Sequence, residues 1–222
     1  MRVPALDSWP ETPQAARMEQ RRLAPLVVDT GILPQARLVA GVDVAFQGDM
    51  AYAAAVMMTW PELAVVSQAT ACMPTTFPYL TGLLSFRELP VMLAALGKLA
   101  GEPDLLVVDG NGQIHPRNFG LACHLGVMLD CPTIGCAKSR LCGTHAIPGL
   151  ERGEASPVWQ NGEVLGLALR SKAACQPIFV SVGHRLSLNE ASRWILLLSQ
   201  GYRLPAPIRL ADKLSKQAKP PR

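Results

Sequence analysis

The feature that most constrains the fold is a series of three strand-like segments that follow one another with almost nothing between them. They are apolar and rich in residues typical of strands, and they occupy residues 39–46, 51–58 and 63–71. Turn residues separate them, first Gln47-Gly48-Asp49 and then Trp60-Pro61. Because connections this short join antiparallel neighbours, the pattern predicts a three-stranded meander.

Helical and strand-like patterns alternate after the meander. Short apolar runs predict buried strands at residues 104–108, 132–136, 164–169 and 178–182. Helical spacing predicts helices at residues 85–99, with Pro90 in the first turn, 118–129 and 187–200. We interpret residues 145–159, rich in Pro, Gly and charge, as a loop. A meander followed by this alternation predicts an α/β domain with a mixed sheet.

The length of 222 residues favours a single domain, with residues 1–37 as an N-terminal extension and residues 213–222 as a flexible basic tail. With 49% hydrophobic and 17% charged residues, the chain can bury enough surface to exclude intrinsic disorder. It contains no apolar run long enough to span a membrane, and its N-terminus does not resemble a signal peptide. We therefore expect a cytoplasmic protein without membrane contact.

The net charge of +4 is distributed unevenly. Residues 202–222 carry +5, which leaves −1 for the remaining 201 residues. A basic C-terminal segment suits a polyanion such as nucleic acid, although a solvated tail explains the charge equally well. The six cysteines include no C-x-x-C pair, which favours reduced thiols over a zinc site.

Two aspartates stand where strands rarely place a carboxylate. Asp43 interrupts an apolar strand, and Asp109 ends another one just before Gly110-Asn111-Gly112. A divalent cation held between two adjacent strands would explain both, because hard cations prefer carboxylate oxygens. The alternatives are a buried ion pair for Asp43 and an ordinary turn residue for Asp109.

Other candidates have ordinary explanations beside the functional ones. Glu88, near a helix N-terminus, is favourable with the helix dipole. Lys138 can neutralise a phosphate or lie at a solvated strand end, and His115 can transfer a proton or lie on the surface. Tyr79, held by Pro78, can be a wedge between bases or pack over a loop.

Several long motifs together resemble the endonuclease V family. One is Val107-Val-Asp-Gly-Asn-Gly-Gln-Ile-His-Pro-Arg117, and the others occupy residues 39–46, 77–88, 132–143, 182–185 and 202–212. The resemblance runs in register from about residue 38 to residue 212. It implies an RNase H-like fold, with a mixed five-stranded core sheet flanked by helices on both faces.

The resemblance also implies an activity and its partners. It indicates a DNA repair endonuclease that recognises deaminated bases such as deoxyinosine and hydrolyses the second phosphodiester bond 3′ to the lesion. The products would carry 3′-hydroxyl and 5′-phosphate ends, with the lesion retained. The cofactor would be Mg²⁺, with Mn²⁺ as a substitute, and inosine-containing RNA is a further candidate substrate. We expect a monomer.

Residue by residue, the resemblance assigns Asp43, Asp109 and Asp212 to the metal and adds Glu88, Lys138 and His115 to the catalytic group. The remaining candidates are residues for substrate binding, and the last two of them would contact the phosphate backbone through their charge: Pro78, Tyr79, Leu80, Gly82, Arg87, Gly110, Asn111, Gly112, Arg117 and Arg140. Among these, Tyr79 matches the wedge that separates the strands, and the loop 110–112 lines the pocket for the displaced base.

The sequence departs from the family pattern at three places. The wedge reads Pro-Tyr-Leu-Thr rather than Pro-Tyr-Ile-Pro, Asn111 stands where His or Gln is frequent, and Gln113-Ile114 differs from the usual residues before the histidine. Two rival functions fit the same residues less well. One is an RNase H-like nuclease specific for junctions or flaps, and the other is a binding module that has lost catalysis.

Overall fold

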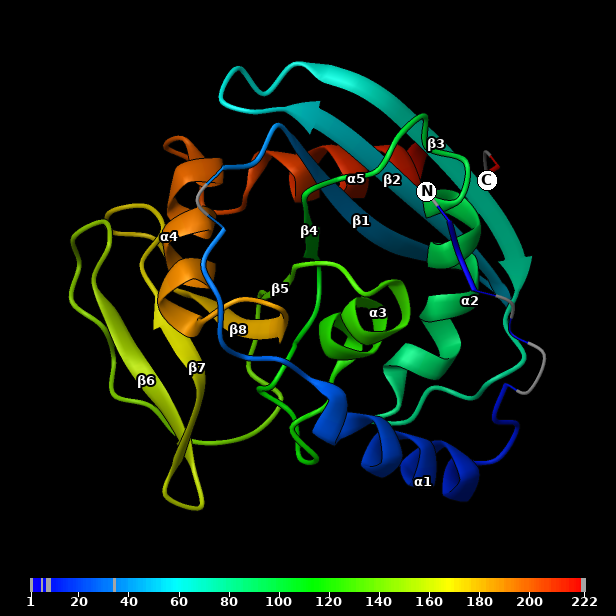
Figure 1. Ribbon diagram of the computed structural model, residues 1–222, viewed down its shortest axis with the longest axis horizontal. Helices are drawn as coiled ribbons and strands as arrows, with labels where there is room; N and C mark the ends of the chain where they lie inside the picture. Colours follow the sequence, from blue (N-terminus) through cyan, green and yellow to red (C-terminus); the bar gives the residue numbers. More distant parts are fainter. Residues whose placement is uncertain (1, 5, 7–8, 34, 221–222) are drawn as a thin grey trace.

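The computed structural model describes the whole chain except residues 1, 5, 7, 8, 34, 221 and 222, and it is built around one mixed sheet (Figure 1). The strands follow the order β3-β2-β1-β4-β5-β8-β7-β6. β1 pairs in parallel with β4, and β4 with β5, whereas the other neighbours are antiparallel. The strands are β1 (Leu38–Gln47), β2 (Met50–Thr59), β3 (Val65–Pro74), β4 (Leu105–Val108), β5 (Thr133–Ala137), β6 (Ala155–Gln160), β7 (Glu163–Leu169) and β8 (Ile178–His184).

Helices cover both faces of the sheet, which confirms the predicted fold class. α2 and α3 pack on one face and α4 and α5 on the other, while α1 lies against α3 at the lower edge in Figure 1. The helices are α1 (Pro13–Leu23), α2 (Leu84–Leu96), α3 (Leu121–Leu129), α4 (Leu188–Ser199) and α5 (Ala206–Gln217), and a 3₁₀ turn (Ala24–Leu26) follows α1. No helix in the described part of the chain has the length and hydropathy needed to cross a bilayer.

β2 illustrates how the sheet is buried on both faces. Its residues alternate between the two cores, with Ala53 and Ala55 toward α2 and Val56 and Met58 on the side of α4 and α5. Alternation is the geometry of any strand, and the small alanine side chains leave room for a helix to approach closely.

The meander is confirmed, but the sheet has eight strands rather than the five that we expected. The first five strands in the chain form the order β3-β2-β1-β4-β5, and β8, β7 and β6 extend that sheet. β6 lies within residues 145–159, which we interpreted as a loop, and reaches Gln160. The overlooked feature is the Asn161-Gly162 pair, where both residues have positive φ angles in a two-residue hairpin turn.

The two ends of the chain are also more ordered than predicted. α1 lies inside the segment that we described only as an extension. α5 continues to Gln217, so residues 213–217 of the expected flexible tail are helical, and Ser215 is fully buried. The last two residues of that expected tail lie outside the described residues.

Pro90 lies in the interior of α2 rather than in its first turn, where we expected it. Proline has no N–H group, so the carbonyl of Phe86 loses its normal helical donor. The indole Nε1 of Trp9 donates a 3.0 Å hydrogen bond to that carbonyl instead. The segment before α1 therefore satisfies a backbone group that the helix itself cannot satisfy.

Candidate active site

Three carboxylates from distant parts of the sequence meet at the end of the parallel strand pair. Asp43 lies on β1, Asp109 directly follows β4, and Asp212 lies on α5. Val42 pairs with Val108, so the residue after each lies at the same edge of the sheet. One carboxylate oxygen from each aspartate lies within 4.8 Å of the others. The structure thus brings together the three residues that the sequence nominated for a metal.

α5 can reach this edge because β1 carries glycine at position 41. A Cβ atom there would overlap the backbone of Pro207 in the first turn of α5. The absence of a side chain lets the helix lie directly on the strand. This close packing places Asp212 beside Asp43.

The Asp43 carboxylate is buried, with 8% of the residue exposed. Burial and the negative charges of Asp109 and Asp212 together raise its pKa to about 6. The hydroxyl of Ser215, 2.7 Å from Oδ2, acts in the opposite direction by donating a hydrogen bond. Asp43 is therefore a carboxylate whose ionised form needs a positive partner.

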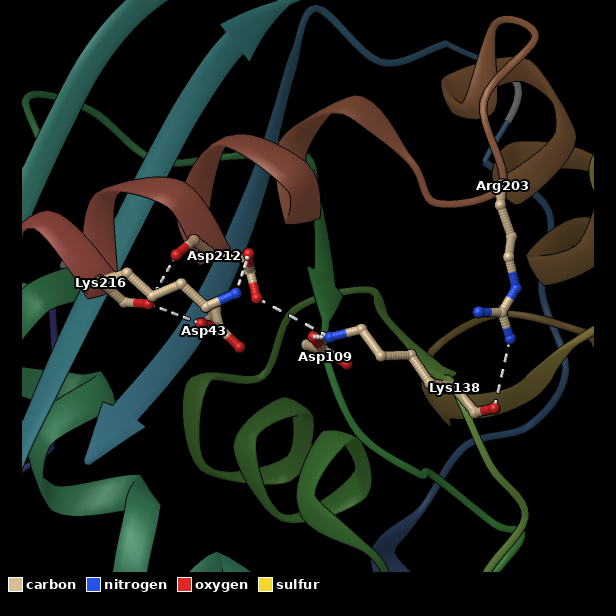
Figure 2. Close-up of polar contacts among 7 residues, drawn as sticks. Asp43, Asp109, Lys138, Arg203, Asp212 and Lys216 are labelled. Carbon is tan, nitrogen blue, oxygen red and sulfur yellow. Dashed lines mark hydrogen bonds and ion pairs between the residues drawn. The ribbon is translucent and has the colours of Figure 1, made fainter. Parts of the chain in front are cut away.

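Two lysines provide positive charge around the cluster, as Figure 2 shows. Lys138 Nζ lies 2.6 Å from Asp109 Oδ2 and 3.8 Å from Asp212 Oδ1. Lys216 Nζ lies 2.7 Å from Asp212 Oδ2. Burial lowers the pKa of Lys138, but the hydrogen bond and charge of Asp109 outweigh this effect and leave the pKa raised. Arg203 donates to the carbonyl of Lys138 at 3.4 Å and so fixes the backbone behind that lysine.

Glu88 is a fourth acid in this environment, buried on α2. Burial and, to a smaller extent, the charges of Asp43 and Asp109 together raise its pKa to about 8. The free protein therefore keeps a proton on Glu88 at neutral pH, which limits the negative charge collected at the site.

The donor set fits a hard divalent cation. One oxygen from each of three carboxylates lies within 4.8 Å of the others, about twice a metal–oxygen distance, and burial makes the ionised form of Asp43 unfavourable. A cation bound by their oxygens would remove that cost.

Beside the cluster lies a pocket of about 100 Å³ whose walls come from separate segments. One wall is the loop before α2, with Tyr79, Leu80 and Gly82, and another is the loop after β4, with Gly110 and Asn111. Gln20, Ser85, His115, Leu121 and Leu141 complete the lining together with Thr81, Leu84 and Gly120. Tyr79 is 73% exposed at the rim, next to Pro78.

His115 is fixed in this wall by both ring nitrogens. Nε2 contacts the carbonyl of Gly82 at 2.9 Å, and Nδ1 accepts the backbone N–H of Arg117 at 3.1 Å. Burial lowers the pKa of His115 to about 4. Its neutral ring has no free nitrogen for a substrate, so its geometry is that of a residue that positions the pocket wall.

The carbonyl of Gly82 receives two further donors. Gln20 Nε2 on α1 lies 3.0 Å away and Arg117 Nη2 lies 2.7 Å away, and Arg117 Nε also donates to Gln20 Oε1 at 2.6 Å. Arg117, which we expected to contact the nucleic-acid backbone, is therefore directed into the protein. It ties the pocket loop to α1.

The other two candidate arginines also contact carbonyl groups. Arg87 donates to the carbonyl of Phe77 at 2.7 Å and lies over the ring of Phe46, and Arg140 donates to the carbonyl of Gly143. Arg87 is thereby a support of the segment that leads to Tyr79, whereas Arg140 stays exposed.

The glycines at 110 and 112 are required by packing. A Cβ at Gly112 would overlap the carbonyl of Val182 on β8, and one at Gly110 would press on the side chain of Leu121. Between them, Asn111 holds its Oδ1 atom buried, and no described residue gives this atom a hydrogen bond. An acceptor in this state is available to a donor that enters the pocket.

Gln20, Ser215 and Lys216 are the site residues that sequence reasoning missed. Ser215 and Lys216 follow Asp212 by three and four positions, which places all three on one side of a helix. That spacing was a usable signal once a helix was expected there. No comparable local pattern marks Gln20.

Comparison with known proteins places these features in a family. The family model for endonuclease V matches residues 21–213. The endonuclease V of Azotobacter vinelandii is 48% identical over 211 residues, which cover 94% of this chain and 96% of that protein.

Solved structures agree with the sequence comparison. The crystal structure of endonuclease V from Streptomyces avermitilis has a TM-score of 0.91 at 44% identity and covers 98% of this chain and 96% of its own. Endonuclease V of Ciona intestinalis, solved in complex with a 23-mer DNA that contains an inosine, has a TM-score of 0.77 at 28% identity, over 92% and 95% of the two chains.

Proposed function

This chain belongs to the endonuclease V family, and we propose that it is a DNA repair nuclease that cuts a strand beside a deaminated base. The substrate is DNA that contains deoxyinosine, and the bond cut is the second phosphodiester 3′ to the lesion. Water adds to phosphorus and the bond to O3′ breaks, which leaves a 3′-hydroxyl and a 5′-phosphate. The observation that carries this proposal is the cluster of Asp43, Asp109 and Asp212 beside the pocket behind Tyr79.

Asp43, Asp109 and Asp212 are the residues that would hold the metal ion, for which we propose Mg²⁺ with Mn²⁺ as a substitute. When bound, the ion supplies charge that lowers the pKa of water and stabilises the leaving oxygen. Lys138, between Asp109 and Asp212, offers its ammonium group to the negative charge of the scissile phosphate.

The pocket behind Tyr79 is the proposed site for the displaced base. A base in a duplex must leave the stack to be read, and a lesion that pairs poorly leaves it at lower cost. Hypoxanthine carries an N–H at position 1 where adenine has an acceptor, and the unpartnered Asn111 Oδ1 is an acceptor at the pocket wall. Tyr79, exposed at the rim, fills the space that the base leaves in the duplex.

The basic C-terminal segment supports a nucleic-acid path away from the metal cluster. A groove between the β1–β2 turn and the end of α5 is lined by Lys216 and Lys219. We propose that the strand follows this groove, that the protein acts as a monomer, and that it works in the cytoplasm, where its six cysteines remain reduced.

The decisive experiment maps the cut on an end-labelled duplex that holds a single deoxyinosine, with Mg²⁺ present. We expect one nick at the second bond 3′ to inosine and none in the matched duplex without the lesion. Asp109→Asn keeps the size of the side chain but removes a charge, and it should slow the nick by about a hundredfold or more.

Three results would contradict parts of this proposal. Wild-type cutting rates for Asp43→Asn and Asp109→Asn would overturn the metal assignment. Cleavage of a four-way junction or flap without inosine would favour a structure-specific nuclease. Preferential cutting of an inosine-containing RNA strand in the same assay would make the protein a ribonuclease.

A further inference from the structure

Ser215 on α5 is the polar group in closest contact with the buried aspartate of the cluster. Its hydroxyl lies 2.7 Å from Asp43 Oδ2, across 172 residues of sequence, and the residue has no exposed surface. It lies two positions beyond the segment that the family model matches. We propose that Ser215 is a positioning residue that orients the Asp43 carboxylate for the metal, an inference that depends on the metal site of the proposed function.

The direction of this hydrogen bond follows from counting protons. A serine hydroxyl has one proton, and two acceptors lie within reach, Asp43 Oδ2 at 2.7 Å and the carbonyl of Asp212 at 3.0 Å. The carboxylate is both the nearer acceptor and the charged one, so it forms the stronger bond. The hydroxyl therefore donates to Asp43 whenever that carboxyl is ionised, which is also the form that binds a cation.

The contact leaves Asp43 Oδ1 without a hydrogen bond among the described residues, so this oxygen is open to an ion. The carboxylate of an aspartate can rotate about its last bond at little cost. Among the described residues, Ser215 is the one hydrogen-bond partner of Asp43 Oδ2. With Oδ2 held by Ser215, Oδ1 is turned to a defined direction before any ion arrives. Hydrogen bonds of this kind to metal-binding carboxylates typically contribute 10- to 100-fold in metal affinity.

The helix makes the arrangement rigid. Asp212 and Ser215 are separated by three positions on α5, so one face of this helix delivers a metal-binding carboxylate and the group that orients another. Lys216, the next residue, holds Asp212 Oδ2 at 2.7 Å. α5 thereby fixes one oxygen on each of two aspartates.

The test measures metal binding by the full-length protein without DNA. The protein is first treated with a chelator and then titrated with MnCl₂ in a calorimeter. Ser215→Ala should weaken Mn²⁺ binding by about 10- to 100-fold. The matched control is Ser199→Ala, another fully buried helical serine, whose hydroxyl donates only to the carbonyl of Ile195 within α4. This control should bind Mn²⁺ within about twofold of wild type.

Cleavage adds a second measurement. In Ser215→Ala the Mg²⁺ concentration for half-maximal rate should rise, while the rate at saturating Mg²⁺ should stay close to wild type. A merely structural role would lower thermal stability without moving that concentration. If Ser215→Ala does not fold, the pair Ser215→Thr and Ser215→Val replaces it, because these two variants have the same shape and differ in the hydroxyl.

The outcomes separate the two proposals. Equal Mn²⁺ affinity in wild type and Ser215→Ala, or in the Thr and Val variants, would overturn the role of Ser215 and leave the nuclease intact. A wild-type protein that binds neither Mn²⁺ nor Mg²⁺ would overturn the metal site itself, and the role of Ser215 with it.

Discussion

At the level of single residues, Glu88 has the largest electrostatic cost in the site. It is buried beside Asp43 and Asp109, and its pKa is raised to about 8. An acid whose pKa is higher in the folded than in the unfolded protein binds more protons when folded. The free energy of unfolding therefore falls as the pH rises between the two pKa values.

This sign can be tested between pH 7 and 8.5 in the metal-free protein. Below that window His115 and His124, whose pKa values burial lowers to about 4, act in the opposite direction. Within it, urea unfolding should show a loss of about 1 to 2 kcal/mol as the pH rises, because Glu88 loses its proton. Glu88→Gln should remove this loss, and an unchanged slope in that variant would refute the raised pKa.

The side chain of Tyr79 is exposed and adds little to the stability of the fold. Its replacement should therefore change the affinity for DNA without changing the free energy of unfolding. Tyr79→Ala should raise the Kd for inosine-containing DNA by roughly 5- to 150-fold, because stacking on a base contributes about 1–3 kcal/mol. Fluorescence anisotropy in Ca²⁺ or chelator measures this without cleavage. Tyr79→Phe keeps the ring and should bind like wild type, while Mn²⁺ affinity should not change in either variant. Equal DNA affinity in Tyr79→Ala would exclude the wedge.

At the level of elements, α2 shows how a distant segment completes a helix. Pro90 removes the normal donor to the Phe86 carbonyl, and Trp9 supplies another one at 3.0 Å. α2 also carries Glu88 between these two positions. The hydrogen bond of Trp9 therefore supports the turn of the helix that places this acid.

A double-mutant cycle isolates that hydrogen bond. Trp9→Phe should lower the free energy of unfolding by about 1–3 kcal/mol, since it leaves a partly buried carbonyl without a donor. In a Pro90→Ala background the alanine N–H can donate to the same carbonyl, so Trp9→Phe should cost less there. Equal costs in both backgrounds, measured by urea unfolding, would mean that only the packing of the indole matters.

At the level of the whole molecule, DNA binding depends on where the charges lie and not on the net charge. The net charge is only +4, but lysines gather at the end of α5, where the groove beside the β1–β2 turn begins. The binding of DNA should therefore depend on a local surface that covers few phosphates.

Salt dependence measures that surface. Replacing Lys219, which lines the groove, by Gln should make the plot of log K against log salt shallower by about one unit, because one phosphate contact is lost. Lys98→Gln is the control, because this exposed lysine lies past the far end of α2 and donates to the carbonyl of Thr70. A slope unchanged by Lys219→Gln would exclude the C-terminal groove as the path of the strand.

The sequence alone determined the elements whose signals are local. Alternation and apolar runs marked the meander and the buried strands, and Asp43 and Asp109 were visible because carboxylates are rare in strands. Asp212 was indicated only by the family resemblance. The β6–β7 hairpin was also legible in its Asn161-Gly162 turn, although the charged residues before it concealed the strand.

The tertiary structure decided which ordinary polar residues join the site. Ser215 reaches Asp43 across 172 positions and Gln20 reaches Gly82 across 62, and nothing in the local pattern of either residue indicates its partner. It also placed His115, which we expected to be catalytic, and Arg117, which we expected to contact the phosphate backbone, on the carbonyl of Gly82 in the pocket wall. The physical reason is that periodicity records which face of an element is buried, whereas hydrogen-bond partners depend on how the elements pack.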